Sequence, residues 1–223
     1  MERRWWALVA SSVFATEVVV DVSQHLSLGL AVGYGVANTI EPVVGALAFF
    51  YLNPDRTSLA ERRGKLSFLV GAVGAGCLVG ALVGATVAVR QRPGSSWLTN
   101  VWHWWTGDGV AVLAIGATIL LVRTSTLSNR RRWELAAAAT ATTGVTFVGL
   151  LVPLVPATVI LPVLAVLAFV FGPVGATLGG GVVALVAHYA TNAGHGYFAK
   201  GDVSPGARMA LLQLFIAVLV IVG

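Results

Sequence analysis

Long uninterrupted runs of apolar residues dominate this sequence and limit what it can fold into. A helix needs about 20 apolar residues to cross a bilayer. Eight runs approach that length, at roughly 5–22, 27–52, 66–89, 101–122, 133–151, 156–171, 174–192 and 207–223. The runs are continuous rather than alternating, which favours helices over a transmembrane barrel. We therefore predict an all-α, polytopic transmembrane bundle of about eight spanning helices.

The composition is that of a membrane protein. Charged residues make up 10% of the chain and hydrophobic residues 57%, whereas soluble domains carry about 25% charged residues. The net charge of +5 does not indicate a nucleic-acid partner, because the arginines fall in short clusters between apolar runs. The single cysteine, Cys77, excludes an internal disulfide and is read as a packing residue. No motif in the chain indicates a cofactor or a metal.

The basic residues predict the orientation. If eight helices alternate, ten Lys and Arg residues fall on one side, before the first run and within 53–65 and 123–132, and four fall on the other. This imbalance predicts that both termini are cytoplasmic and that the chain is a multi-pass protein of the inner membrane. The charged start resembles a signal peptide, but no clear cleavage site precedes Glu17 and Asp21, so we expect a retained first helix.

Glycines spaced four residues apart predict close helix packing. Gly76, Gly80 and Gly84 share one helix face, and two further pairs repeat the spacing, Gly29 with Gly33 and Gly175 with Gly179. Small residues at this spacing let two backbones approach closely in a membrane. We interpret these faces as packing surfaces inside the bundle, with a homodimer face as the alternative.

Polar residues within the apolar runs predict a site, because an acidic residue at the centre of a membrane helix costs about 2.5 to 3.5 kcal/mol. If the helices alternate as above, these residues from four helices lie at similar depth, on the non-cytoplasmic side of the centre. The candidate ligand-binding residues are Glu17, Asp21, Asn38, Glu41, Trp105, Asp108, His188 and Asn192. We expect them to converge on a solvated hollow.

Each candidate also has a structural interpretation. Asp108 follows Thr106 and Gly107, a pattern typical of a helix N-cap. Glu41 could be a neutral acid bonded to a neighbouring helix, and Glu17 and Asp21 could line a water-filled entrance. His188 could be a packing histidine. The tryptophans at 102, 104 and 105 fit the interfacial aromatic belt, and Pro42 suits a helix that lines a cavity.

Several of these segments resemble a known family. The blocks "ANTIEPVVGALAFFYL" (37–52), "WLTNVWHWWTGDGVAVLAIGATILL" (97–121), "VLAFVFGPVGATLGGGVVALVAHYATNAGHGYF" (166–198) and "ARMALLQLFIAVLVIVG" (207–223) follow one another in family order. Together they resemble the bacterial membrane-associated sensor domain of the first class, the MASE family. The residues that match the polar motifs of that family are Asn38, Glu41, Trp105, Gly107 and Asp108.

The chain departs from the family pattern in places. We find no Trp-Pro-Pro-x-Gly segment, Val170 replaces an arginine before Phe-Gly-Pro, and Ala111-Val112 replace the usual glycine after Asp108. The resemblance implies one sensory input domain over residues 1–223, without enzymatic activity of its own. It also implies a cytoplasmic output domain beyond residue 223, of the diguanylate cyclase, histidine kinase or phosphatase type. Two-component or cyclic di-GMP signalling would follow.

Alternative functions come from the same residues. Our leading hypothesis is an input domain that binds a small ligand or a membrane-protein partner in an outer polar pocket. Intramembrane carboxyls also mark ion pathways, so a transporter or channel for small solutes or ions is the alternative. A haem or metal protein could use His25, His103, His188 and His195. No nucleophile elbow, phosphate loop or metalloprotease helix indicates an enzyme. The remaining expected partners are membrane lipid and a possible second copy of the chain.

Overall fold

The computed structural model describes residues 5–91, 94–151 and 159–195, together with the single positions 199, 207, 211, 213 and 214. All secondary structure among these residues is helical, as predicted. The chain divides into two compact units, residues 1–109 and 110–223. We describe the two units separately. Five helical segments of the described residues are long and apolar enough to cross a membrane, which agrees with a multi-pass membrane domain.

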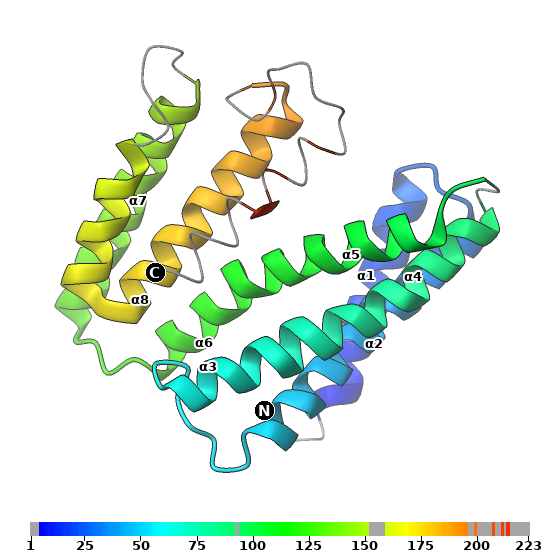
Figure 1. Ribbon diagram of the computed structural model, residues 1–223, viewed down its shortest axis with the longest axis horizontal. Coiled ribbons are helices and arrows are strands. Elements are labelled where there is room, and N and C mark those ends of the chain that lie inside the picture. Colours follow the sequence, from blue (N-terminus) through cyan, green and yellow to red (C-terminus); the bar gives the residue numbers. More distant parts are fainter. Residues whose placement is uncertain are drawn as a thin grey trace. The chain divides into compact units, whose positions relative to one another are not determined.

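The first unit contains α1 (Trp6–Ser23), α2 (Leu28–Leu52) and a long helix made of α3 (Arg62–Phe68), η2 (Leu69–Gly76) and α4 (Cys77–Gln91). Most of α5 (Trp97–Ala111) also belongs to it. Helix α2 packs against α1 on one face and against η2 and α4 on another (Figure 1). Helix α1 has no buried residue, so α2 is the central helix of this unit.

Glycines bring α2 and its neighbours into backbone contact. A Cβ atom at Gly76 would lie 2.7 Å from the Cα atom of Gly45, and one at Gly71 would lie 2.6 Å from the backbone nitrogen of Phe49. Neither position therefore has room for a side chain. Lipid tails are as apolar as the helices, so close packing of this kind takes the place of hydrophobic collapse. The interpretation of the Gly76, Gly80 and Gly84 face as a packing surface inside the bundle is confirmed.

The second unit contains η3 (Val112–Gly116), α6 (Ala117–Thr124), α7 (Asn129–Leu151) and α8 (Ile160–Asn192). Helix α8 is interrupted at Gly172, whose φ of 60° and ψ of −146° are not helical. The chain folds back there, because Leu167, before the break, contacts both Gly175 and Gly179, after it. Two residues 12 apart on a straight helix would lie about 18 Å apart. The Gly175 and Gly179 face therefore packs within a helical hairpin.

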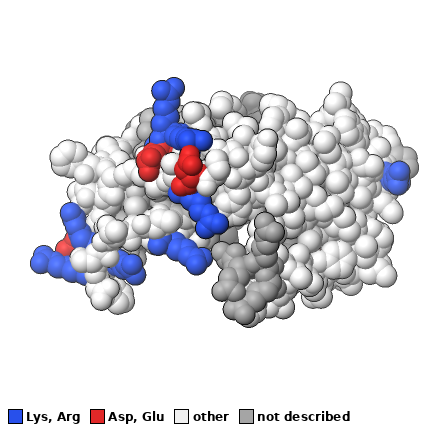
Figure 2. Space-filling model, turned by 90° about the horizontal axis from the view of Figure 1, so that it is seen from below, with Lys and Arg blue, Asp and Glu red and all other residues white. Residues whose placement is uncertain are grey.

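An arginine holds this hairpin beside the start of α7. The Arg131 guanidinium lies 5.5 Å from the centre of the Phe171 ring, in the range of a cation–π contact. Arg131 and Arg130 also pair with Glu134, at 3.7 and 2.9 Å. The turn at Gly172 therefore lies at the same end of α7 as its arginine cluster. Figure 2 shows that most of the face drawn there carries no charged side chain.

The predicted runs match the described helices closely. The sixth and seventh runs belong to α8 and separate at Gly172, as their sequence limits indicated. The eighth run, 207–223, lies outside the described residues except at 207, 211, 213 and 214. The number of spans and the cytoplasmic placement of the termini stay predictions. Helix α7 occupies the fifth run but is not among the five segments apolar enough to span.

Replacing Gly172 should destabilise the hairpin. Its backbone conformation is nearly exclusive to glycine, so Gly172→Ala should cost about 1 to 3 kcal/mol. Gly144→Ala, in α7, is the control, because its Cβ would meet no atom within 4 Å. Thermal unfolding in detergent should show a lower midpoint for Gly172→Ala than for the parent. The midpoint of the control should not fall. Equal midpoints would contradict the assigned turn.

Candidate functional site

The carboxyl groups of Glu41 and Asp108 meet in the first unit. Glu41 lies near the middle of α2, and Asp108 lies well inside α5. The Asp108 carboxyl contacts the Glu41 carboxyl and the Trp104 side chain. Its Oδ2 atom is buried and has no hydrogen-bond partner among the described residues. Two residues 67 positions apart in the sequence thus form one acidic pair between packed helices.

Small residues of the third long helix make room for this pair. A Cβ atom at Gly80 would lie 2.6 Å from Glu41 Oε2, and one at Gly76 would lie 3.1 Å from the Glu41 carbonyl oxygen. The Cys77 thiol, fully buried, also contacts the Glu41 carboxyl. The glycine face at four-residue spacing therefore serves as the wall against which the Glu41 side chain lies.

Tryptophans close the pair on the other sides. The Trp104 ring lies against Gly84, where a Cβ atom would collide with it, and meets the Tyr34 ring edge to face at 5.0 Å. The Trp105 indole nitrogen donates to the Val73 carbonyl at 3.3 Å. Val73 belongs to η2, a π-helical segment, and such segments occur frequently at functional sites. Both tryptophans are half-buried and hold α5 against the long helix.

A second polar pair lies between α1 and α2. The Asn38 amide donates to Glu17 Oε1. Asp21 is half-buried, within electrostatic reach of Glu17, and its Oδ2 atom has no hydrogen-bond partner among the described residues. Glu17 is in turn within electrostatic reach of Asp108. Pro42 has no backbone N–H, so the Asn38 carbonyl loses its usual donor four residues ahead. The polar groups of α1, α2 and α5 therefore form one carboxyl cluster, which we define as Glu17, Asp21, Asn38, Glu41 and Asp108.

Two predicted residues belong to the other unit. His188, near the end of α8, is exposed, and Asn192 ends that helix. Both are part of the second unit, so the structure does not join them to the carboxyl cluster. The expectation of a ligand site for any of the eight candidates stays a prediction.

The N-cap interpretation of Asp108 is wrong. Helix α5 begins at Trp97, so Asp108 lies in the helix interior, and the continuous helix runs through η3 to Thr124. The pattern Thr106-Gly107-Asp108 suggested a helix start because glycine and aspartate have low helix propensity. Propensity is a weak constraint that tertiary context overrides, so the helix continues through these residues. Within the described ranges, no group of three His, Cys, Asp or Glu side chains is placed to hold a metal ion.

Sequence reasoning missed several residues that line the cluster. Tyr34, Cys77, Gly80 and Trp104 contact its members or each other. A signal was available for two of them: Tyr34 precedes Asn38 by four residues, one helical turn, and Trp104 precedes Asp108 by the same distance. Cys77 is the first residue of α4 and follows Gly76 directly. Its apolar sequence neighbours gave no indication that its thiol contacts a carboxyl.

The contact at Gly76 gives a testable prediction. A side chain at Gly76 would push α2 and its Glu41 away, so Gly76→Ala should cost about 1 to 3 kcal/mol through overpacking. Gly29→Ala is the control on α2, because its Cβ would lie an ordinary 3.4 Å from the flexible Gln91 side chain. Thermal unfolding in detergent measures both. A Gly76→Ala protein as stable as Gly29→Ala would argue against the close helix approach.

Comparison with known proteins agrees with this architecture. No curated protein and no solved structure matches the chain. A family model does: the model described as MASE1 matches residues 1–223, the whole chain. MASE1 domains are membrane-associated sensory domains, and the match confirms the resemblance seen in the sequence. The carboxyl cluster and its tryptophans are thus found in a sensory membrane domain, and the chain belongs to the MASE1 family.

Proposed function

We propose that this chain is the input domain of a bacterial signalling protein of the inner membrane, and that the carboxyl cluster is its sensing site. The observation that carries the proposal is the contact between Glu41 and Asp108. Two carboxyls in a helical bundle are costly in hydrocarbon, and no lysine, arginine or histidine of the described chain forms an ion pair with them. Packing alone would not require this pair.

The chemistry of the cluster indicates what it binds. Two adjacent carboxyls within a low-dielectric interior are stabilised when a proton or a cationic group lies between them. The carboxyl oxygens, the Asn38 side-chain oxygen and the Asn38 backbone carbonyl, which lacks the usual donor at Pro42, offer acceptors on neighbouring helices. The site therefore suits a small ligand with a cationic or hydrogen-bond-donating group, entering from the non-cytoplasmic side. A membrane-protein partner that presents such a group could bind at the same site.

The connection to an output follows from the position of Asp108. It lies four residues before η3 in a helix that continues to Thr124. A ligand that binds one arrangement of α2 and α5 better than another shifts the population between them. That shift would pass along this helix toward the cytoplasmic arginine cluster of α7 and an output domain of the cyclase, kinase or phosphatase type.

Charge-neutral substitutions test the sensing site. In the full-length protein, Asp108→Asn and Glu41→Gln should each abolish the change in output that an inducing condition produces, because each removes one carboxyl of the pair. Glu61→Gln is the matched control, since this exposed glutamate lies in the same unit but outside the carboxyl cluster. Output activity with and without inducer is the measurement, with thermal unfolding to confirm folding.

The outcome separates the two functions. If both variants fold and respond like the parent to every inducing condition, the sensing assignment is wrong. If instead purified protein in proteoliposomes moves ions and Asp108→Asn stops that flux, the transporter alternative replaces it. The intramembrane carboxyls are the observation that favours this second candidate.

A further inference from the structure

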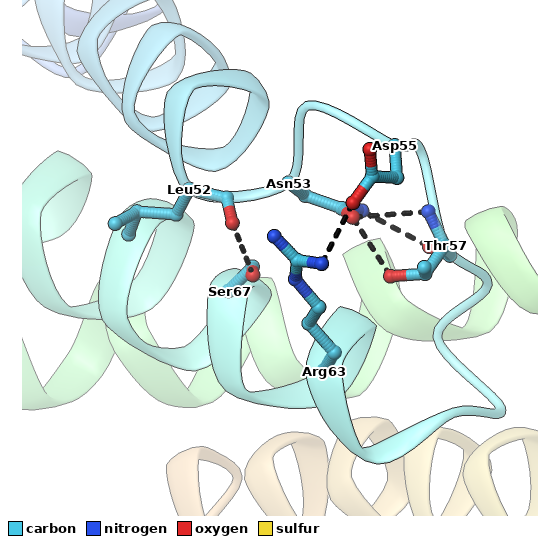
Figure 3. Close-up of polar contacts among 6 residues, drawn as sticks. All are labelled: Leu52, Asn53, Asp55, Thr57, Arg63 and Ser67. Atoms are coloured by element: carbon cyan, nitrogen blue, oxygen red, sulfur yellow. Dashed lines mark hydrogen bonds and ion pairs between the residues drawn. The ribbon is translucent and has the colours of Figure 1, made fainter.

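The loop between α2 and α3 is held in one conformation by its own polar contacts (Figure 3). Asn53 is 2% exposed, and its side chain both donates to the Thr57 carbonyl at 3.0 Å and accepts from the Thr57 backbone N–H at 2.9 Å. The Thr57 hydroxyl adds a third bond to the Asn53 oxygen at 2.7 Å. Ser67 ties the start of the long helix to Leu52 at 3.1 Å.

This ordered loop presents cations that lack a partner. Arg63 pairs with Asp55 at 2.7 Å and is thereby neutralised. Arg56, Arg62 and Lys65 are exposed and form no ion pair with a described residue. Arg56 has a positive φ of 51°, which the surrounding contacts must maintain. One further acidic residue, Glu61, is exposed in the loop, so positive charge predominates.

Apolar side chains adjoin these cations along the chain. Tyr51 is 85% exposed, Phe50 is 47% exposed at the end of α2, and Leu66 follows Lys65 and is 50% exposed. An exposed tyrosine at a helix end is typical of the boundary between headgroups and acyl chains. In the sequence the three cations lie between the exposed apolar residues at the end of α2 and Leu66 of α3. A basic segment flanked by apolar side chains matches the two halves of an anionic phospholipid.

We propose that residues 50–66 form a preformed binding site for an anionic phospholipid, with Arg56, Arg62 and Lys65 contacting its phosphate and Phe50, Tyr51 and Leu66 its acyl chains. Basic clusters directly beside membrane helices bind anionic lipids at the cytoplasmic leaflet. The fixed loop lowers the ordering cost of binding, because its backbone is already placed. The site is separate from the carboxyl cluster, so the proposal does not depend on the sensing function.

Native mass spectrometry of the purified chain tests this, with phosphatidylglycerol as the probe and phosphatidylcholine as the neutral comparison. We expect phosphatidylglycerol to be retained preferentially. Combined R56Q, R62Q and K65Q should weaken its binding by at least about tenfold. The control that combines R123Q, R130Q and R132Q removes the same charge from exposed positions of α6 and α7. It leaves Arg131 over the Phe171 ring and should bind nearly as well as the parent.

A further variant tests the preformed loop. Asn53→Ala keeps every charge but removes the three bonds to Thr57, so it should also bind phosphatidylglycerol more weakly. Equal losses in the two triple variants, or no loss in the first, would overturn the site. Competition by inorganic phosphate at equal potency would show a phosphate site rather than a lipid site and overturn it too. If Asn53→Ala binds like the parent, the preformed loop is wrong; if it does not fold, the charge variants decide.

Discussion

Backbone contact between α2 and the long helix formed by α3, η2 and α4 is the constraint on which the first unit depends. Gly45, Gly71 and Gly76 let the two helices touch without intervening side chains. In a bilayer, where lipid and helix are equally apolar, such contact holds helices together because it maximises dispersion and excludes lipid. The same contact sets the position of the Glu41 side chain along the long helix, beside Gly80. This position determines where the Asp108 carboxyl can contact Glu41.

The acidic pair of Glu41 and Asp108 depends on that packing for its environment. A carboxyl on a lipid-facing helix surface would be excluded from the membrane, but between helices it has polar neighbours and a shaped wall. The tryptophans of α5 keep this wall closed, Trp104 against Gly84 and Trp105 against the η2 carbonyl of Val73. Polar chemistry and close packing therefore occupy the same few helix turns, so a change in one must disturb the other.

The ends of the helices are ordered by charged side chains rather than by close backbone packing. Arg63 with Asp55, and Arg130 with Glu134, are exposed ion pairs, and such pairs contribute little to stability, about 0 to 1 kcal/mol. These pairs matter for their position: they order the segments at the ends of the helices, and Arg131 also lies over Phe171, beside the Gly172 turn. Surface electrostatics thus arranges the ends of helices whose interiors are held by packing.

The sequence by itself determined the all-helical class, the membrane setting, most helix limits and the polar residues worth testing, because hydropathy and charge are local properties of the chain. It also separated the runs on either side of Gly172. Only the tertiary structure decided that Glu41 meets Asp108, that Glu17 meets Asn38, that Asp108 lies in a helix interior, and that Tyr34, Cys77 and Trp104 line the cluster. His188 and Asn192 belong to the other unit. Which side chains face one another depends on helix rotation and neighbour choice, and these are set by contacts between residues far apart in the sequence.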